Sequence, residues 1–545
     1  MANENLRALA ARKELNNNLF EQISELSLKD AAENEFHELA KSFFMDDSVV
    51  YGTTSFYDFL KPENRNKKIH ICNGTACLVA RTQESLHHQL EKHFKVDEIG
   101  HAACVGRCHE NSAFMLDDKV YSADSSEKIK EILNHKSIQE NQYHIGCNTT
   151  PILTKPVADI TAFYQLIKTY KNNPTAVIYA LKTANLRGRG GAGFPFYFKV
   201  DAVSKEPFDS AQGVQKYVVC NADEGDPGAY SDMYLLEHQT HKVLFGMMMT
   251  GLIVGANTGV LYIRAEYPDA IRKTQNAIQE LTDLNLLNGF KFKIIRGQGA
   301  YVCGEETALL NSIEGLRPEV RVRPPFPTQS GLFGKPTLLS NVETFANVHW
   351  ILENGGKAYA NLGTAKSTGT KLVSLDSYFN QPGIYEIEMG TPIATIFNDY
   401  GKGLKTDIKA WQIGGPLGGI VPNEKIKDLT LDFESLNENG FLLGHASFVS
   451  IPKDFPMISF IEHLLKFTAD ESCGKCYPCR IGSYRGYELV KKAQEEAYQI
   501  DKQLFADLLE TLEIGSLCAL GGGIPLPLKN ALQYFSDELS PYFKN

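Results

Sequence analysis

The chain has 545 residues, a formal net charge of −10 and 43% apolar residues, enough for about three or four domains with hydrophobic cores. It has no strong basic block, which argues against nucleic acid as a partner. The N-terminal stretch MANENLRALAARKEL is polar and lacks the apolar core of a secretory signal. We therefore expect an intracellular chain whose 11 cysteines stay reduced, and for the eight that fall into two tight groups metal binding is favoured over disulfides.

Residues 1–62 and 63–148 are the first two predicted units. The first reads as short amphipathic helices ending in SVVYGTTSFYDFL. The second contains a strand (KKIHICNG), a helix (QESLHHQLEKHF), a hairpin (SAFMLDDKVYS) and a closing helix (SSEKIKEILN). This order predicts a small α/β unit, followed near residue 150 by a linker, HIGCNTTPILTKP.

The small α/β unit contains the first of two cysteine groups. Its members form two pairs, Cys72-x4-Cys77 and Cys104-x3-Cys108. Two separated pairs suit a [2Fe–2S] cluster, because each pair can hold one iron. Glycines within both pairs let backbone N–H groups approach the sulfurs. A zinc site also fits this spacing and stays open. Cys147, Cys220 and Cys303 follow no ligand spacing, and we expect them to be buried bystanders.

Residues 149–345 form the largest predicted unit. Helices are expected at 174–186, 240–256 and 268–280, and strands at KYVVCNA, VLYIRA and FKIIRG. This alternation predicts a parallel, doubly wound sheet. The uncharged segment 243–263 is long enough to span a membrane. Asn257 and Gly259 interrupt it, so we expect a buried helix, a turn and a buried strand, with no membrane insertion.

The segment NLRGRGGAGFP contains the glycine spacing of a dinucleotide-binding turn. The matching residues are Gly188, Gly190 and Gly193. Such a turn must follow a strand, yet the preceding residues, PTAVIYALKTANL, have helical periodicity. A glycine-dense loop still exposes N–H groups to an anion, and Arg187, Arg189 and Lys199 add positive charge. The residues favour a phosphate loop of another kind, with a flexible connector as the alternative.

Two acidic loops follow predicted strands of the same unit. The first, CNADEGDPGAY, offers Asn221, Asp223, Glu224 and Asp226. The second, RGQGAYVCGEETALL, offers Tyr301, Gly304, Glu305 and Glu306. Ligands of a doubly wound sheet gather beyond the carboxyl ends of its strands, where carboxylates can bind ribityl or ribose hydroxyls. The alternatives are an exposed acidic turn for the first loop and a helix-dipole role for Glu305 and Glu306.

The rest of the chain divides into a strand-rich unit, 346–428, and a mostly helical unit, 429–545. The strand-rich unit includes KLVSLDS, GIYEIEMG and GGPLGG. The helical unit contains the second cysteine group, Cys473-x2-Cys476-x2-Cys479 with a remote Cys518. Three closely spaced cysteines and a distant fourth favour a [4Fe–4S] cluster. Zinc and unligated cysteines are the alternatives.

Together these motifs resemble the NADH-oxidising flavoprotein subunit of respiratory complex I and the diaphorase subunits of NAD-reducing hydrogenases and formate dehydrogenases. The resemblance covers about 150–525 through RGRGGAGFP, CNADEGDPG, GAYVCGEETALLNSIEG, PPFPTQSGLFGKPT, NVET and ESCGKCYPCRIG. Residues 1–150 resemble the family's [2Fe–2S] subunit through VVYGTTSFYDFL and CNGTACLVAR. The implied fold is α/β multidomain: a thioredoxin-like [2Fe–2S] domain, a Rossmann-like FMN- and NADH-binding domain, a β-grasp (SLBB-like) domain and a C-terminal helical [4Fe–4S] bundle.

The resemblance also implies which residues bind each cofactor. FMN would be held by residues matching Gly188, Arg189, Gly190, Lys199, Asn221, Asp223, Glu224, Tyr301, Gly304, Glu305, Ser340, Asn341 and Thr344. NADH would stack on the flavin near Gly191, Phe194, Asp226, Glu306, Arg323 and Phe326. Glu306 would act as the catalytic residue by shaping the nicotinamide site, while Lys199 and the glycine loop hold the flavin phosphate. The eight grouped cysteines would hold the two clusters.

The implied activity is that of an NADH:acceptor oxidoreductase. Hydride would pass reversibly between NAD(H) and FMN, and single electrons would pass through the clusters to or from an iron–sulfur partner subunit of a larger redox complex. The expected location is the cytoplasm, including the inner face of a membrane where partner subunits attach there.

Three departures from the family pattern leave alternatives open. GFPFYFKV stands where GFPTGLKW is usual, so Val200, Asp201 and Ala202 occupy the place of an expected aromatic. Asp226 stands where glutamate is frequent, and Arg323 where lysine is frequent. The changes leave the choice between NAD and NADP open. They also motivate a second hypothesis, a non-catalytic iron–sulfur wire or redox sensor that has lost its flavin site, and a zinc-stabilised scaffold is a third.

Overall fold

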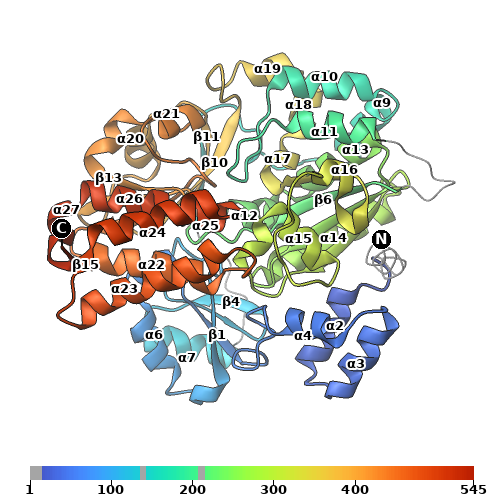
Figure 1. Cartoon of the computed structure of the whole chain (residues 1–545). Helices are drawn as coiled ribbons and strands as arrows, with labels where there is room; N and C mark the ends of the chain where they lie inside the picture. The colour runs from blue at the N-terminus through green and yellow to red at the C-terminus, as the bar shows by residue number, and fades with distance from the viewer. Residues whose placement is uncertain (1–14, 136–142, 207–214, 545) are drawn as a thin grey trace.

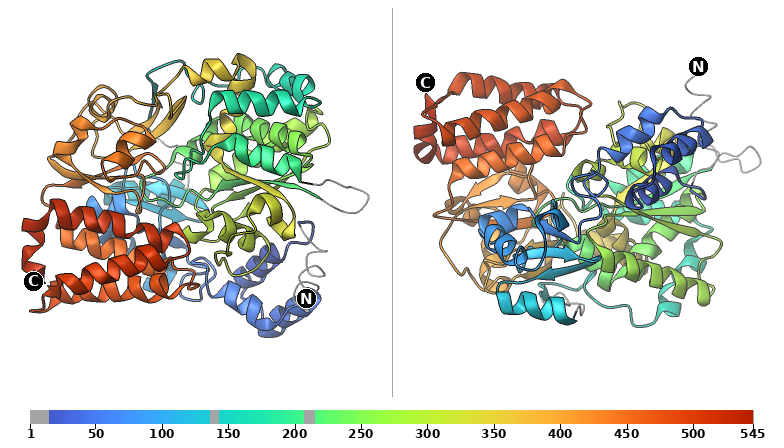
Figure 2. Two further views of the ribbon diagram at one scale, coloured as in Figure 1. Left: turned by 45° about the horizontal axis from the view of Figure 1, so that its top comes forward. Right: turned by 90° about the horizontal axis from the view of Figure 1, so that it is seen from below.

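The computed structural model describes residues 15–135, 143–206 and 215–544. Figure 1 shows the N-terminal helices and a small α/β domain in blue, a central sheet with its helices in green, a second sheet in orange and a helical bundle in red. Seen from below in Figure 2, the small α/β domain lies against both the orange and the green sheets. The parts therefore meet around a common centre, where the candidate site lies.

The N-terminal segment is helical, as predicted, within the part that is described; residues 1–14 lie outside it. Its helices are α2 (Leu19–Leu28), α3 (Glu33–Ser42) and α4 (Asp47–Thr54). The segment attaches to the central domain through buried polar contacts. Asn18 donates from Nδ2 to the carbonyl of Ile313 at 2.7 Å, and the Tyr57 hydroxyl donates to Ser312 at 2.7 Å.

The small α/β domain has a four-stranded sheet in the order β2-β1-β3-β4. Its elements are β1 (Ile69–Cys72), α5 (Thr75–Val79), α6 (Gln83–Leu90), β2 (Ile99–Ala102), β3 (Ala113–Leu116), β4 (Lys119–Ser122) and α7 (Ser126–His135). β1 pairs parallel with β2 and antiparallel with β3, and β3–β4 is the predicted hairpin. The predicted strand, helix, hairpin and closing helix are confirmed, whereas the sequence does not predict β2 and α5.

The predicted linker near residue 150 is a strand. β5 (His144–Cys147) pairs parallel with β11 (Gly383–Glu388) at the edge of the second sheet. A buried carboxylate explains why the following residues are fixed: Glu386 accepts hydrogen bonds from the backbone N–H groups of Ile152 and Leu153 at 2.8 and 2.9 Å. Cys147 on this strand is half-buried rather than buried, whereas Cys220 and Cys303 are buried as expected.

The central sheet is fully parallel, in the order β8-β7-β6-β9. Its strands are β6 (Tyr217–Ala222), β7 (Thr258–Ile263), β8 (Lys291–Arg296) and β9 (Thr337–Asn341). Its main helices are α10 (Pro174–Ala184), α11 (Phe196–Lys205), α12 (Ser231–His238), α13 (Thr240–Val254), α14 (Pro268–Asp283), α15 (Glu306–Ile313), α17 (Val342–Ala346) and α18 (Val348–Asn354). The strand order reverses between β6 and β9, so their carboxyl ends form the switch point where such sheets bind ligands.

The uncharged segment 243–263 folds as a helix, a turn and a strand, as its interruption by Asn257 and Gly259 predicts. α13 ends at Val254, Gly255 takes a left-handed φ of 83°, and β7 follows. The helix is buried on nearly every side, since it packs under the sheet. Within the described residues, no helix is both long and apolar enough to cross a membrane.

The second sheet is mixed, in the order β13-β12-β14-β10-β11-β5. Its further strands are β10 (Thr370–Leu375), β12 (Ile408–Ile413), β13 (Ile420–Pro422) and β14 (Ser447–Pro452). β14 lies in the middle of this sheet, beyond the predicted boundary at 428, and β5 joins it from before the boundary at 149. The sequence does not predict these pairings, because β5 and β14 each pair with a strand that lies far away along the chain.

The C-terminal helices form the predicted bundle. They are α22 (Met457–Asp470), α23 (Ser483–Glu495), α24 (Lys502–Gly515), α25 (Ala519–Gly523) and α26 (Pro525–Tyr534). A π-helical turn, Pro478–Gly482, precedes α23. Figure 1 shows the bundle in red, with α25 at the end of the bundle nearest the central sheet.

Candidate active site

A cavity of about 1060 Å³ lies at the switch point of the central sheet. Most residues predicted to bind FMN or NADH line it. They are Gly188, Gly190, Gly191, Phe194, Lys199, Asn221, Asp223, Glu224, Asp226, Tyr301, Gly304, Glu305, Glu306, Arg323, Phe326, Ser340 and Asn341. The volume lies slightly above the range typical of ligand pockets, about 300–1,000 Å³.

The glycine-rich loop joins two helices. α10 ends at Ala184 and is capped by Asn185, which has a left-handed φ of 51°, and α11 begins at Phe196. Between them Arg187 pairs with Pro195 as an antiparallel bridge, and the Gly188 N–H donates to the carbonyl of Phe194 at 2.8 Å. The loop is therefore a tight hairpin between helices, which confirms that it is not a strand-to-helix dinucleotide turn.

Two predicted cofactor residues do not line the cavity. The Arg189 side chain is fully buried and donates to the Tyr359 hydroxyl at 3.0 Å and to the Thr368 carbonyl at 2.5 Å. Thr344 accepts the backbone N–H of Arg189 at 2.9 Å through its hydroxyl. Both side chains brace the loop from behind, because the arginine finds hydrogen-bond acceptors in the interior rather than at the cavity wall.

The loop after β6 places two carboxylates at the cavity, one with an unpaired oxygen and the next already hydrogen-bonded. Asp223 Oδ2 is buried without a hydrogen-bond partner among the described residues, and burial raises the pKa of Asp223 to about 8. Its free oxygen fits a hydroxyl donor supplied by a ligand. Glu224 is already satisfied, since it accepts the backbone N–H groups of Asp232 and Met233 at 3.0 and 3.1 Å.

A buried group of titratable side chains forms the inner wall of the cavity. His445 lies 3.2 Å from Asp232 and 3.4 Å from Glu224. Burial alone lowers the pKa of His445, but Asp232 and Glu224 outweigh it and raise the pKa to about 9. Burial and the charge of Asp232 raise the pKa of Glu224 to about 7. His445 therefore retains its proton near neutral pH, and Glu224 is partly protonated there.

The loop after β8 contributes a tyrosine and two glutamates. The Tyr301 hydroxyl donates to Asp226 at 2.8 Å, so these two side chains form one wall. Glu305 caps α15 by accepting the backbone N–H groups of Thr307 and Ala308, both at 2.9 Å, which is the structural role left open by the sequence.

Glu306 lies between two cations. Lys199 Nζ is 3.0 Å from its carboxylate and Arg323 Nη1 is 2.9 Å from it. Burial raises the pKa of Glu306, but Lys199 and Arg323 outweigh it and the pKa is lowered. Lys199 also donates to the Leu339 carbonyl at 3.2 Å. Glu306 is therefore a fixed negative charge within the cavity wall.

Three exposed aromatic rings mark the mouth of the cavity: Phe194, Phe198 and Phe326. The rings of Phe194 and Phe198 lie edge to face with centroids 6.1 Å apart. Phe198 belongs to the unusual GFPFYFKV segment, while Val200 from the same segment is buried in the core. An aromatic face is thus present at the mouth, from a position that the family pattern does not mark.

The second cysteine group converges beside the cavity. Cys473, Cys476 and Cys479 lie between α22 and α23, and Cys518 precedes α25. Cys518 itself lines the cavity. Burial and the charges of the other three cysteines raise the pKa of Cys479 to about 12, against a hydrogen bond from Ser472 that lowers it. Four cysteines gathered at one place can release their protons together only when bound cations offset the repulsion between their thiolates, and iron supplies those cations.

The first cysteine group is enclosed in the small α/β domain. Cys72, Cys77, Cys104 and Cys108 are all buried. The sulfurs of Cys104 and Cys108 lie 3.5 Å apart, and the Gly106 N–H points at the Cys104 sulfur at 3.5 Å. Backbone N–H groups aimed at sulfur are the environment of an iron–sulfur cluster.

Three family profiles match these parts of the chain. The thioredoxin-like [2Fe-2S] ferredoxin matches residues 29–137, the Nuo51 FMN-binding domain residues 181–350, and the NADH-ubiquinone oxidoreductase-F iron-sulfur binding region residues 459–542.

Relatives and solved structures agree with these profiles. NADP-reducing hydrogenase subunit HndC of Solidesulfovibrio fructosivorans is 40% identical over 384 residues, which cover 68% of this chain and 77% of the relative. The NADH-quinone oxidoreductase F subunit of Salmonella typhimurium is 37% identical over 384 residues, 68% of this chain and 85% of the relative. The chain belongs to the family of flavoprotein subunits that includes these two relatives. An air-oxidised NAD+-reducing [NiFe]-hydrogenase chain matches 98% of this chain, and 93% of its own length, with a TM-score of 0.84 at 26% identity.

Membership of this family identifies the cofactors as FMN, one [4Fe–4S] and one [2Fe–2S] cluster. The protein is an oxidoreductase subunit that passes electrons from NADH to iron–sulfur clusters. The residues fit these groups: Asp223 offers an unpaired acceptor, Gly304 leaves the wall open, and the cysteines of each set lie close enough to interact with one another. The relatives are named as subunits of larger enzymes, which agrees with a function within a complex.

Sequence reasoning missed the part of the cavity wall formed outside the central domain. The second sheet contributes Gly414, Leu417, Gly418, Gly444 and His445, and the bundle contributes Ala519 and Leu520. A signal existed in the glycine-dense GGPLGG. At Gly415, which has a φ of +84°, a Cβ would lie 2.4 Å from Cγ of Asp226. Only glycine lets this loop close against the acidic loop.

Proposed function

We propose that the cavity binds FMN on its glycine-loop side and the nicotinamide of NAD(H) on its Glu306 side. FMN, when bound, accepts or returns a hydride and gives or takes single electrons, so no protein acid or base is needed for the hydride step. The chain's own residues bind, orient and exclude water. The observation that supports the proposal best is that one cavity unites the glycine loop, Glu306 and the cluster cysteine Cys518.

The flavin side is defined by small residues and free acceptors. Gly188, Gly190 and Gly304 provide backbone without side chains, and Asp223 provides the unpaired oxygen for a ribityl hydroxyl. Asn221 is oriented by donating from Nδ2 to the Gly304 carbonyl at 2.8 Å. Arg189 and Thr344 act indirectly, by fixing the shape of the glycine loop.

The nicotinamide side is defined by fixed charge and aromatic rings. Glu306 is locked by Lys199 and Arg323, so its charge is preorganised and needs no rearrangement when a developing positive charge appears on the nicotinamide. Phe194, Phe198 and Phe326 supply the apolar faces for a dinucleotide at the mouth.

The dinucleotide is NAD(H) rather than NADP(H) in this proposal. Each cationic side chain that lines the cavity within the described residues already has a carboxylate partner: Lys199 and Arg323 pair with Glu306, Lys205 pairs with Asp201 at 2.5 Å, and His445 pairs with Asp232 at 3.2 Å. A 2′-phosphate would have to break one of these pairs. Glu206 at the rim adds a negative charge that repels it.

Electrons leave toward an iron–sulfur subunit from the surface around the [4Fe–4S] cysteines. That surface is apolar and exposed, with Tyr477, Ile481, Tyr484, Ile514 and Leu517. Tyr477 adjoins Cys476 and Leu517 adjoins Cys518, so the patch surrounds the cluster. Exposed apolar patches of this kind mark protein interfaces. The complex would lie in the cytoplasm, including the inner face of a membrane.

The test is an anaerobic purification with quantification of FMN and iron, together with NADH- and NADPH-dependent dye reduction. About one FMN and about six irons per chain are expected from one [2Fe–2S] and one [4Fe–4S] cluster. NADH should reduce the dye much faster than NADPH. Equal rates with the two dinucleotides would contradict the assignment of NAD.

The alternative of a non-catalytic wire predicts a different result from the same preparation. Iron without flavin, and no bleaching of flavin absorption by either dinucleotide in stopped flow, would support it. The retained cavity and its unpaired Asp223 oxygen speak against this alternative.

A further inference from the structure

One buried arginine joins the [2Fe–2S] domain to the flavin domain. Arg264 directly follows β7 and is 3% exposed. Its Nη2 donates to the carbonyl of the cluster ligand Cys104 at 2.7 Å and to Glu266 at 2.7 Å. Its Nη1 donates to the carbonyl of Glu224, in the acidic loop of the flavin cavity. A single guanidinium thus contacts both the cluster loop and the cavity loop.

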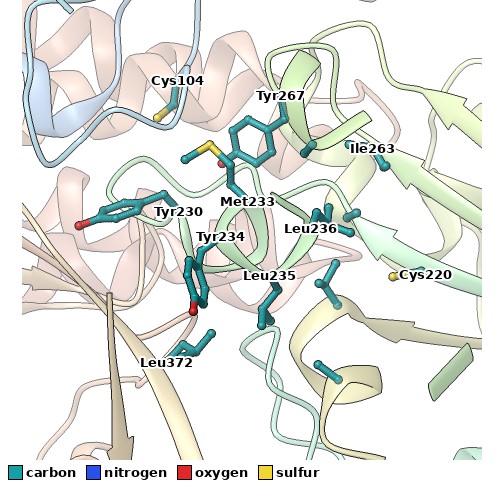
Figure 3. Close-up of a cluster of buried hydrophobic side chains, with 14 of the residues drawn as sticks. Cys104, Cys220, Tyr230, Met233, Tyr234, Leu235, Leu236, Ile263, Tyr267 and Leu372 are labelled. Carbon is teal, nitrogen blue, oxygen red and sulfur yellow. The ribbon is translucent and has the colours of Figure 1, made fainter. Parts of the chain in front are cut away.

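The packing around Arg264 holds the cluster loop in close contact. Its guanidinium lies 5.0 Å from the ring centre of Tyr267, and Tyr267 donates its hydroxyl to Glu224 at 3.1 Å. At Gly106, which has a φ of +77°, a Cβ would lie 2.8 Å from the Tyr267 ring and 2.9 Å from the Met233 sulfur. Figure 3 shows Cys104 facing Met233 and Tyr267 across this contact.

The charge of Arg264 lies in a buried environment. Glu266 is its only carboxylate partner within the part of the chain that the structure describes, and both side chains are buried. Burial weakens solvent screening, so a nearby positive charge acts strongly on a group that gains an electron. Hydrogen bonding and charge around the ligands are the means by which proteins set cluster potentials.

We propose that Arg264 is a positioning residue that holds the [2Fe–2S] loop on the flavin loop and raises the reduction potential of that cluster. Cluster reduction adds one electron and one negative charge, with reduced flavin as the donor, and breaks no bond. Arg264 stabilises the reduced form through its charge and through its hydrogen bond to the Cys104 carbonyl. The inference rests on Cys72, Cys77, Cys104 and Cys108 as the cluster ligands.

The test is a redox titration of the full chain, with the [2Fe–2S] signal followed by electron paramagnetic resonance. Dithionite and mediators reduce the cluster, so the result does not depend on the NADH site. Arg264→Gln should lower the potential by about 59 mV, a tenfold change in a one-electron equilibrium. Arg264→Lys, which keeps the charge, should lie nearer the unchanged protein.

Two further variants separate charge from structure. Glu266→Gln removes the negative partner of Arg264 and should shift the potential upward, opposite to Arg264→Gln. Arg296→Gln is the matched control, since Arg296 pairs with Asp118 at 2.6 Å across the same two domains on the exposed surface. It should leave the potential unchanged.

An unchanged potential in Arg264→Gln with its cluster intact would overturn the inference. Shifts of the same sign in Arg264→Gln and Glu266→Gln would also overturn it, because a structural disturbance rather than charge would then be responsible. If Arg264→Gln loses its cluster, the sign of the Glu266→Gln shift decides: upward supports the role of Arg264, and unchanged or downward refutes it.

Discussion

The two cysteine sets differ in how they face solvent. The [2Fe–2S] ligands are all buried, and their loop is fastened to the flavin domain by Arg264. The [4Fe–4S] set lies partly open, with Cys476 and Cys518 of intermediate exposure and Tyr477 and Ile514 each 76% exposed nearby. One centre is enclosed by the chain itself, and the other borders both the flavin cavity and the surface.

We infer from this difference in exposure that the two centres have distinct roles. Electron transfer to a partner needs a centre close to the surface, and electron transfer from flavin needs one close to the cavity. Cys518 satisfies both, because it lines the cavity and adjoins the apolar patch. The enclosed [2Fe–2S] centre is better suited to hold an electron than to deliver it. This interpretation makes unequal effects of cysteine substitutions the first expectation.

The largest effect is expected from Cys518→Ser, with Cys104→Ser as the matched variant. Loss of a [4Fe–4S] ligand should reduce electron delivery to cytochrome c at least about tenfold, while NADH still bleaches the flavin; about 1.4 kcal/mol of barrier corresponds to this factor. Cys104→Ser should retain most of the delivery. Stopped-flow absorption of flavin and cytochrome measures both steps.

The comparison fails if Cys104→Ser stops cytochrome reduction as completely as Cys518→Ser. The [2Fe–2S] centre would then lie on the main path. Iron content of each variant shows that only the intended cluster is lost.

A smaller effect, common to both centres, is expected from Glu306→Gln. Lys199 and Arg323 would lose their shared partner, and the fixed negative charge beside the nicotinamide would vanish. Flavin reduction by NADH should slow about tenfold, within the range for lost electrostatic preorganisation. Both cluster signals should then appear equally late in rapid-freeze spectra.

Asp201→Asn is the control for Glu306→Gln, since Asp201 pairs with Lys205 at the same cavity. It should leave the rate of flavin reduction nearly unchanged. A delay of one cluster only, in Glu306→Gln, would place Glu306 after the flavin rather than before it.

The sequence predicts features whose residues lie close together along the chain and misses those formed by distant segments. Both cysteine sets are recognisable because most ligands are close along the chain, as in Cys473-x2-Cys476-x2-Cys479. The parallel sheet follows from the alternation of helices and strands. The cavity wall contributed by Gly414 and His445 does not, since these residues reach the acidic loop from the second sheet, far along the chain.

The direction of a side chain and the pairing partner of a short strand are further features that the sequence does not predict. Arg189 stands in a glycine loop where a cation suggests phosphate, yet its acceptors, Tyr359 and the Thr368 carbonyl, lie far away in sequence. The sequence predicts a linker where β5 lies, because four residues give little periodicity and the pairing edge on β11 belongs to a distant segment. Local pattern predicts elements and ligands; side-chain direction depends on distant partners.

The last expected effect is on stability rather than on electron transfer, and it concerns the proton held by His445 on the inner wall of the cavity. The pKa of His445 is about 9 in the folded chain against an ordinary 6.5, so its contribution to stability is fully present below about 6.5 and is lost as pH rises through about 9. The raised pKa of Glu224, about 7, acts with the same sign at lower pH. His445→Gln should remove about 3 kcal/mol of this pH-dependent stability. Calorimetry at pH 6.5 and 9.5 should show a smaller fall in melting temperature for His445→Gln than for the unchanged chain.

His37→Gln is the control, because His37 pairs with Asp47 on the exposed N-terminal helices. An equal fall in all three proteins would show that His445 does not hold its proton in the folded state.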